Sequence, residues 1–266
     1  MTATLTLPRL WEMKKNGEKI VCATAYDYPS AAVLDSANVH MILVGDSLGM
    51  VVQGKENTLP VTMDEMVYHT QMVARAAQNA FVIADMPFLS YHEDHAQAIR
   101  NAGRLIKEGG AAAVKLEGGA GVAHVVSALV KSDIPVQAHI GLTPQSILQM
   151  GGFRVQRDAG RLLADAYSVQ EAGAMSVVLE GIPAAVAKKI TARSKIPTIG
   201  IGAGPYCDGQ VLVFHDLIGF TNRKRPKFAK AYANMWEIAQ AAAAAYVKEV
   251  EDGSFPDSDH TYDPIS

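Results

Sequence analysis

Eight short apolar runs, separated by segments of helical length, constrain the fold of this chain more than any other feature. The runs are rich in Val and Ile and alternate little between polar and apolar residues, which is typical of parallel strands covered on both faces. They lie at Ile20–Ala25, Met41–Val44, Phe81–Ala84, Ala112–Leu116, Pro135–His139, Ser176–Leu179, Pro197–Ile201 and Val211–Phe214. The chain has 266 residues, and barrels of eight β/α units run to about 250 residues in one domain. We therefore predict an α/β fold, a single (β/α)8 TIM barrel, in preference to an open doubly wound sheet.

Amphipathic segments fill the intervals between these runs. Thr62 and Glu65 predict a capping box for the second of them. The predicted helices are Pro29–Ala37, Met63–Ala77, Asp94–Lys107, Gly121–Lys131, Ala159–Ala172, Ala184–Arg193 and Ala229–Val250. A further helix over residues 7–16 precedes the first strand, and we expect it to cap the bottom of the barrel. We expect Ala229–Val250 to cover the outside of the barrel. The domain prediction is one unit over residues 1–266, ending in a polar tail at 252–266.

Bulk composition argues against several classes of protein. The net charge is −3, so no basic excess points to nucleic acid or an anionic membrane. One basic run, residues 223–227, is better explained as a solvated loop than as an anion site. The sequence contains no stretch of about 18 apolar residues, so no membrane span is predicted. The first eight residues do not resemble a signal peptide. The two cysteines, Cys22 and Cys207, suggest neither a disulfide framework nor a zinc site. We expect a cytoplasmic protein.

Carboxylates recur at the ends of the predicted strands. Asp46, Asp85, Glu117 and Glu180 each follow an apolar run. The carboxyl ends of parallel strands share one face, so these acids should converge there. Converging carboxylates repel one another unless a cation or a proton relieves them. We therefore predict a divalent metal site at Asp46, Asp85 and Glu117, although Asp46 or Asp85 alone is equally well explained as a helix N-cap.

Three more side chains are candidates for chemistry. Lys115 lies two residues before Glu117, so both point to the same side of their strand. Lys115 could hold a substrate carboxylate, or the two could form a buried ion pair. His139 ends the fifth strand, where a structural and a functional role are equally consistent with the sequence. Glu180 follows a fully apolar run, where reduced solvation makes a carboxylate a better base; the alternative is a cap for the next helix.

Long strings in this chain resemble the ketopantoate hydroxymethyltransferase family, and the resemblance spans roughly residues 8–262. The matching strings are TAYD at 24–27, LVGDSLGM at 43–50, TLPVT at 58–62, ADMPF at 84–88, VKLEGG at 114–119, HIGLTPQ at 139–145, GGFRVQ at 151–156, VLE at 178–180, IGIGAG at 199–204, CDGQVLV at 207–213 and HD at 215–216. So many strings in the same order are far more specific than any single motif.

The resemblance implies an activity and a set of roles. It implies hydroxymethyl transfer from the co-substrate 5,10-methylenetetrahydrofolate to 3-methyl-2-oxobutanoate, giving 2-dehydropantoate through an enolate stabilised by one Mg²⁺ per subunit. It implies Asp46, Asp85 and Glu117 as metal residues. Asp46, Ser47, Asp85 and Lys115 match the oxo-acid contacts, and Glu180 matches the catalytic base. We add His139 as a candidate to lie behind the metal ligands and orient them. The family also implies a homo-oligomer, often a decamer.

One departure and two alternatives accompany this resemblance. Family members usually carry more residues after the Val155-Gln156 pair, whereas Arg157 follows directly here, so we expect a shorter loop that bears on folate contacts. The alternative enzyme is a Mg²⁺-dependent carbon–carbon lyase or phosphonomutase acting on a related 2-oxo acid. The alternative of another class is a non-catalytic barrel that binds a metabolite or a partner.

Overall fold

A computed structural model describes residues 5–262 of the chain. By their internal contacts the residues form two compact units, the first ending at Phe214 and the second beginning at His215. The first unit holds all the strands of the sheet. That residues 1–266 constitute one domain stays a prediction. The last four residues of the predicted polar tail, 263–266, lie outside the described residues.

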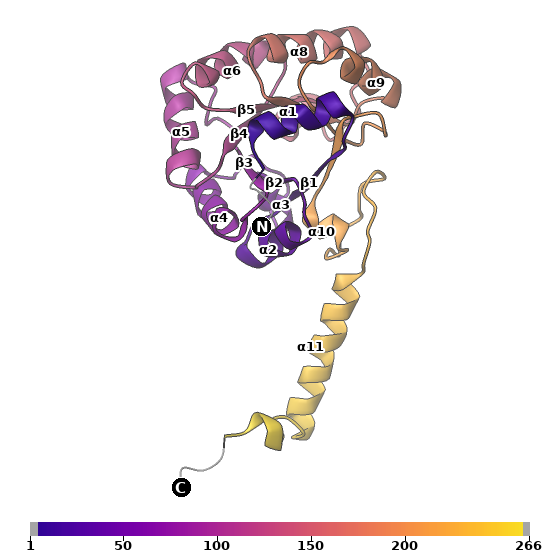
Figure 1. Ribbon diagram of the computed structural model, residues 1–266. Coiled ribbons are helices and arrows are strands. Elements are labelled where there is room, and N and C mark those ends of the chain that lie inside the picture. Colours follow the sequence, from indigo (N-terminus) through magenta and orange to yellow (C-terminus); the bar gives the residue numbers. More distant parts are fainter. Residues whose placement is uncertain (1–4, 263–266) are drawn as a thin grey trace. The chain divides into compact units, whose positions relative to one another are not determined.

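Eight parallel strands close into a barrel in sequence order, β1 beside β2 and finally β8 beside β1. The strands are β1 (Ile20–Thr24), β2 (Met41–Val44), β3 (Phe81–Asp85), β4 (Ala113–Glu117), β5 (Val136–Gly141), β6 (Ser176–Glu180), β7 (Thr198–Ile201) and β8 (Gly209–Leu212). Helices surround this barrel in the ribbon diagram (Figure 1). The prediction of a (β/α)8 barrel is confirmed.

The helices of the first unit largely follow the predicted segments. They are α1 (Leu7–Asn16), α2 (Tyr28–Ser36), α3 (Leu48–Val51), α4 (Met63–Ala76), α5 (His95–Lys107), η1 (Ala120–Val122), α6 (Ala123–Val130), η2 (Pro144–Ser146), α7 (Ile147–Met150), α8 (Ala159–Glu171) and α9 (Ala184–Arg193). The capping box of Thr62 and Glu65 is present at the start of α4. The short turns α3, α7 and η2 were not predicted, because a single helical turn is too short to show a periodic pattern.

An apolar cluster fills the lower part of the barrel interior, toward the amino ends of the strands. Ile20, Met41 and Phe81, which begin β1, β2 and β3, belong to it. Leu10 and Met13 of α1 join the same cluster. The predicted capping helix is therefore confirmed, and Figure 1 shows α1 lying across this end of the barrel.

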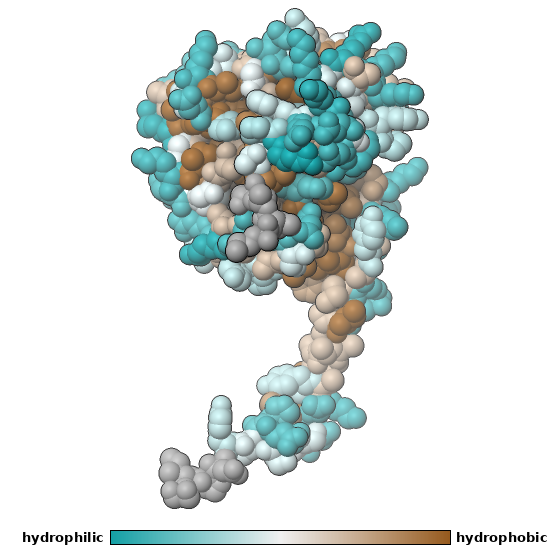
Figure 2. Space-filling view, viewed as in Figure 1, coloured by the Kyte–Doolittle hydropathy of each residue, from teal (hydrophilic) through white to brown (hydrophobic). Residues whose placement is uncertain are grey.

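A second apolar cluster lies between the strands and the surrounding helices. Val82 and Ala84 of β3, for example, pack in this outer layer, whereas Phe81 and Ile83 belong to the inner cluster. This alternation explains why the strand sequences are apolar throughout. In the space-filling view, hydrophilic side chains cover much of the face that carries α1, with apolar patches between them (Figure 2).

The eighth strand was predicted two residues too late. The prediction was Val211–Phe214, but β8 runs from Gly209 to Leu212. Gly209 pairs with both Ile20 and Ile199, so the barrel closes through a residue with no side chain. A Cβ at this position would lie 2.3 Å from the carbonyl oxygen of Ile20. Residues 202–208, before this strand, contain no helix, as predicted.

The second unit is built around one long helix. Helix α10 (Phe214–Leu217) begins at the junction, α11 (Met235–Asp252) follows, and η3 (Ser258–His260) comes last. Helix α11 starts six residues later than predicted, because the preceding segment pairs elsewhere: Tyr232 N–H donates to the Leu217 carbonyl at 2.8 Å. None of its residues is buried. That it covers the barrel stays a prediction.

Candidate active site

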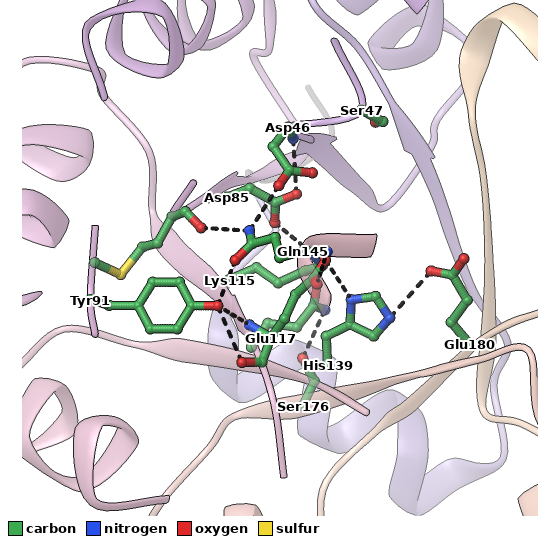
Figure 3. Close-up of polar contacts among 12 residues, drawn as sticks. Asp46, Ser47, Asp85, Tyr91, Lys115, Glu117, His139, Gln145, Ser176 and Glu180 are labelled. Atoms are coloured by element: carbon green, nitrogen blue, oxygen red, sulfur yellow. Dashed lines mark hydrogen bonds and ion pairs between the residues drawn. The ribbon is translucent and has the colours of Figure 1, made fainter. Parts of the chain in front are cut away.

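Three of the predicted acids lie together at the carboxyl ends of neighbouring strands (Figure 3). Asp85 and Glu117 are the last residues of β3 and β4, and Asp46 lies just beyond β2. Each is between 3% and 5% exposed. The backbone N–H of Asp46 donates to Asp85 Oδ2 at 3.0 Å, which ties the ends of β2 and β3 together. The convergence expected from the strand ends is therefore present.

Lys115 lies among these acids. It pairs in register with Asp85 on the neighbouring strand, and its Nζ lies 2.6 Å from Asp85 Oδ1 and 4.0 Å from Glu117 Oε1. Burial works against the ammonium, but Asp85, Glu117 and Asp46 raise its pKa, so it remains charged. The ion pair considered from the sequence therefore exists, although it involves Asp85 more closely than Glu117.

His139 connects the acid cluster to Glu180. Its Nδ1 lies 3.4 Å from Glu117 Oε1, and its Nε2 lies 3.2 Å from Glu180 Oε2. Among the described residues neither ring nitrogen has a partner in hydrogen-bond geometry, so these contacts are ion pairs rather than aligned hydrogen bonds. Although burial and Lys115 oppose the charge, the two carboxylates raise the pKa of His139 to about 9.

Glu180 and Ser47 lie at the edge of this cluster. Glu180 ends β6, and its side chain is 16% exposed, more than those of the other site acids. The hydroxyl of Ser47 lies 2.8 Å from that of Tyr26. A Cβ at position 45 would lie only 2.8 Å from Ser47 Oγ, so a residue larger than Gly45 would crowd this hydroxyl. Both residues lie at the carboxyl ends of the strands, Glu180 as the last residue of β6 and Ser47 three residues after β2.

Two residues of the site, Gln145 and Tyr91, were not predicted. The amide nitrogen of Gln145 donates to Asp46 Oδ2 at 2.8 Å, and the Tyr91 hydroxyl donates to the amide oxygen at 2.7 Å. Gln145 lies in η2, directly after β5. A side-chain amide that follows closely after a predicted strand is the sequence signal that could have identified it. Tyr91 lies well beyond β3, and no sequence pattern marks it.

The electrostatics of the cluster are uneven. Burial, together with Asp85 and Glu117, raises the pKa of Asp46 well above its ordinary value. Burial also raises the pKa of Asp85, although Lys115 opposes this. For Glu117 burial is outweighed by the contacts with His139 and Lys115 and by a backbone N–H, so its pKa is lowered. Negative charge is therefore least compensated at Asp46.

This set of side chains fits a hard divalent cation. Carboxylate oxygens are the ligands that Mg²⁺ prefers, usually one or two of them, with water completing the shell. The uncompensated charge at Asp46 is the kind that such a cation relieves. Within residues 5–262, no three His, Cys, Asp or Glu side chains converge as a ready-made metal cluster.

Comparison with protein families identifies close relatives. A family model described as ketopantoate hydroxymethyltransferase matches residues 4–258. A 3-methyl-2-oxobutanoate hydroxymethyltransferase from Desulforapulum autotrophicum is 57% identical over 262 residues, covering 98% of this chain and all of the relative. The protein of the same name from Geotalea daltonii is 55% identical over 266 residues, with the same coverage.

Solved structures with lower identity share the fold. Phosphonopyruvate hydrolase aligns with a TM-score of 0.64 at 12% identity, covering 98% of this chain and 92% of the other. A 2,3-dimethylmalate lyase, described as a member of the PEP mutase/isocitrate lyase superfamily, aligns with a TM-score of 0.63 at 19% identity, covering 96% and 91%. At such identities the likeness concerns the barrel and not the reaction.

Proposed function

The chain belongs to the ketopantoate hydroxymethyltransferase family, and we propose that it makes 2-dehydropantoate for pantothenate biosynthesis. In the proposed reaction, 3-methyl-2-oxobutanoate loses its C3 proton and forms a carbon–carbon bond to the methylene carbon of 5,10-methylenetetrahydrofolate. Water supplies the hydroxyl group, and tetrahydrofolate leaves. The observation that carries the proposal is the 57% identity to a named 3-methyl-2-oxobutanoate hydroxymethyltransferase over its whole length.

The acid cluster supports a binding role toward the 2-oxo acid and a metal ion. We assign Mg²⁺ to Asp46 and Asp85, with Glu117 behind it. When bound, the ion would withdraw electron density from the 2-oxo acid and so make its C3–H more acidic. Lys115 offers an ammonium to the substrate carboxylate, and the Ser47 hydroxyl offers a hydrogen bond. Asp46 and Asp85 would then contact both the metal and the substrate.

Glu180 is the proposed base. Its carboxylate lies beside His139 at 3.2 Å and is the most exposed of the site acids, so it can meet a substrate seated on the buried cluster. We assign it removal of the C3 proton, after which the carbanion attacks the folate methylene. A positioned general base typically contributes about 10² to 10⁴ in rate. His139, held between Glu117 and Glu180, limits the directions that the Glu180 side chain can take.

A direct assay tests this proposal. The protein is incubated with Mg²⁺, 3-methyl-2-oxobutanoate and methylenetetrahydrofolate, and 2-dehydropantoate is measured by mass spectrometry. Omission of folate should abolish the product but still allow exchange of the C3 proton in deuterium oxide. Product formed from a larger acid by cleavage would instead support the lyase or phosphonomutase alternative. A protein that binds the oxo acid but neither exchanges its proton nor forms product would support the non-catalytic barrel.

Two further expectations extend this proposal. The resemblance implies a homo-oligomer, often a decamer, which light scattering after gel filtration would measure. In the part of the chain that the structure describes, no helix is long and apolar enough to cross a membrane. We propose a cytoplasmic enzyme whose partners are small molecules and not nucleic acid or membrane.

A further inference from the structure

A single residue, Gln145, contacts two of the acids in the candidate site. Gln145 is 6% exposed. Its side-chain nitrogen donates to Asp46 Oδ2 at 2.8 Å and to the Met86 carbonyl at 3.0 Å. Its backbone N–H donates to Glu117 Oε2 at 2.9 Å. Gln145, in the short helix η2 that follows β5, thus contacts both Asp46, which lies beyond β2, and Glu117, which ends β4 (Figure 3).

The surroundings of the amide permit only one orientation. The Met86 carbonyl can only accept a hydrogen bond, so it requires the NH₂ side of the amide whatever the charge on Asp46. The amide oxygen lies 2.7 Å from the hydroxyl of Tyr91, which can donate. A rotated amide would place its oxygen against two acceptors and its NH₂ group against Tyr91.

Tyr91 is itself fixed on the other side. It is 1% exposed, and its hydroxyl accepts from the backbone N–H of Glu117 at 3.2 Å. Two acceptors then lie near the single hydroxyl hydrogen, the Glu117 carbonyl at 3.2 Å and the Gln145 amide oxygen at 2.7 Å, and the shorter contact favours Gln145. A chain of hydrogen bonds therefore runs from the backbone of β4 through Tyr91 and Gln145 to Asp46.

We propose that Gln145 is a positioning residue for the metal and oxo-acid site, and that Tyr91 fixes the orientation of its amide. By occupying Asp46 Oδ2, the amide determines which way the Asp46 carboxylate faces. The other oxygen of Asp46 is then directed for use by a cation. Hydrogen-bonding partners of metal ligands commonly affect metal affinity by about 10- to 100-fold. The inference rests on the proposed function, because it assumes a cation at these acids.

Titration with Mg²⁺ alone, followed by calorimetry, tests the proposal without turnover. Gln145→Leu keeps the backbone N–H to Glu117 but removes the amide, so Mg²⁺ affinity should fall by about 10- to 100-fold. Tyr91→Phe removes one oxygen atom and should weaken Mg²⁺ binding by about 5-fold. Because Tyr91 acts through the amide, adding Tyr91→Phe to Gln145→Leu should cause little further loss.

A matched control separates positioning from general damage to the barrel. Gln137, which lies on β5, also carries a buried side-chain amide; it is 1% exposed, and its nitrogen donates to Ser176 Oγ at 3.0 Å. Gln137→Leu should lower the unfolding temperature but leave Mg²⁺ affinity unchanged. A purely structural role for Gln145 predicts the same behaviour in both variants. Raising the Mg²⁺ concentration should restore activity to Gln145→Leu and not to a variant that is merely unstable.

The outcomes distinguish this inference from the proposed function. Wild-type Mg²⁺ affinity in Gln145→Leu, or independent additive losses from the two substitutions, would overturn the role of the amide. If Gln145→Leu does not fold, Tyr91→Phe decides, because it changes a single atom. Wild-type protein that binds Mg²⁺ but makes no 2-dehydropantoate would refute the proposed reaction and leave the positioning role standing. Wild-type protein that binds no Mg²⁺ would refute both the metal site and this inference.

Discussion

Lys115→Met should affect both the stability of the barrel and the binding of the oxo acid. Lys115 Nζ lies 2.6 Å from Asp85 Oδ1, and the two side chains are 5% and 4% exposed. Removing one member of a buried ion pair typically costs about 3–5 kcal/mol, because the other charge stays buried without a partner. At about 2–4 °C per kcal/mol for a domain of this size, the unfolding midpoint should fall by about 6–20 °C.

The loss should depend on pH in a defined direction. Burial already raises the pKa of Asp85, and loss of the nearby ammonium would raise it further. Protonation then neutralises the unpaired carboxyl group, so Lys115→Met should be less destabilising near pH 5 than near pH 8. Thermal unfolding of both proteins in EDTA, followed by circular dichroism at the two pH values, measures this difference.

Kinetics then separate an anchor for substrate from a structural pair. If Lys115 holds the substrate carboxylate, the KM for the oxo acid should rise at least tenfold, whereas the KM for the folate should change little. The matched control is Lys14→Met, because Lys14 Nζ pairs with Asp208 Oδ2 at 2.7 Å, well away from the acid cluster. It should lower stability without changing either KM. Equal effects of Lys115→Met on both KM values, or an unchanged unfolding midpoint, would refute the reasoning.

Three further predictions concern the neighbouring side chains. Asp85→Asn should weaken Mg²⁺ binding and activity together, because a neutral amide is a poorer ligand for a hard cation, and full activity of the wild type in excess EDTA would contradict this. Glu180→Gln should still bind Mg²⁺ and oxo acid but exchange the C3 proton about 10²- to 10⁴-fold more slowly; exchange at the wild-type rate would transfer the role to another base. His139 has a folded pKa of about 9 against an ordinary value of 6.5, so its contribution to stability is full below pH 6.5 and lost as the pH rises through 9. In the absence of metal, His139→Gln should reduce the pH dependence of the free energy of unfolding between pH 6.5 and 9. An unchanged pH dependence would show that the charge of His139 does not contribute to stability.

The fold was predictable because each strand carries a local apolar pattern, and because eight β/α units in a chain of this length favour a closed barrel. Val82 and Ala84 face helices while Phe81 and Ile83 face the interior, so the run reads as apolar and marks a covered strand. The eighth strand was misplaced because Gly209 and Gln210 carry no apolar signal. Their place in the sheet depends on partners in β1 and β7 that no local pattern reveals.

The candidate site was predictable to the extent that it consists of strand ends. Asp85, Lys115 and Glu117 lie where alternation along β3 and β4 places them. Which acid Lys115 would approach was not predictable, because that depends on the register between two strands. Gln145 was missed for a related reason: its role comes from a one-turn helix, η2, and from Tyr91 on a different loop.

The plugged lower half of the barrel has a consequence for the order of events in catalysis. Helix α1 lies across one end of the barrel, and apolar side chains fill the space above it. Substrates should therefore reach the acids, and products leave them, through the opposite end. A small acid seated on Lys115 would then lie beneath the much larger pterin. We expect a compulsory sequence in which the small molecule enters first and its enlarged form leaves last. Product-inhibition patterns at fixed concentrations of each reactant would reveal that sequence.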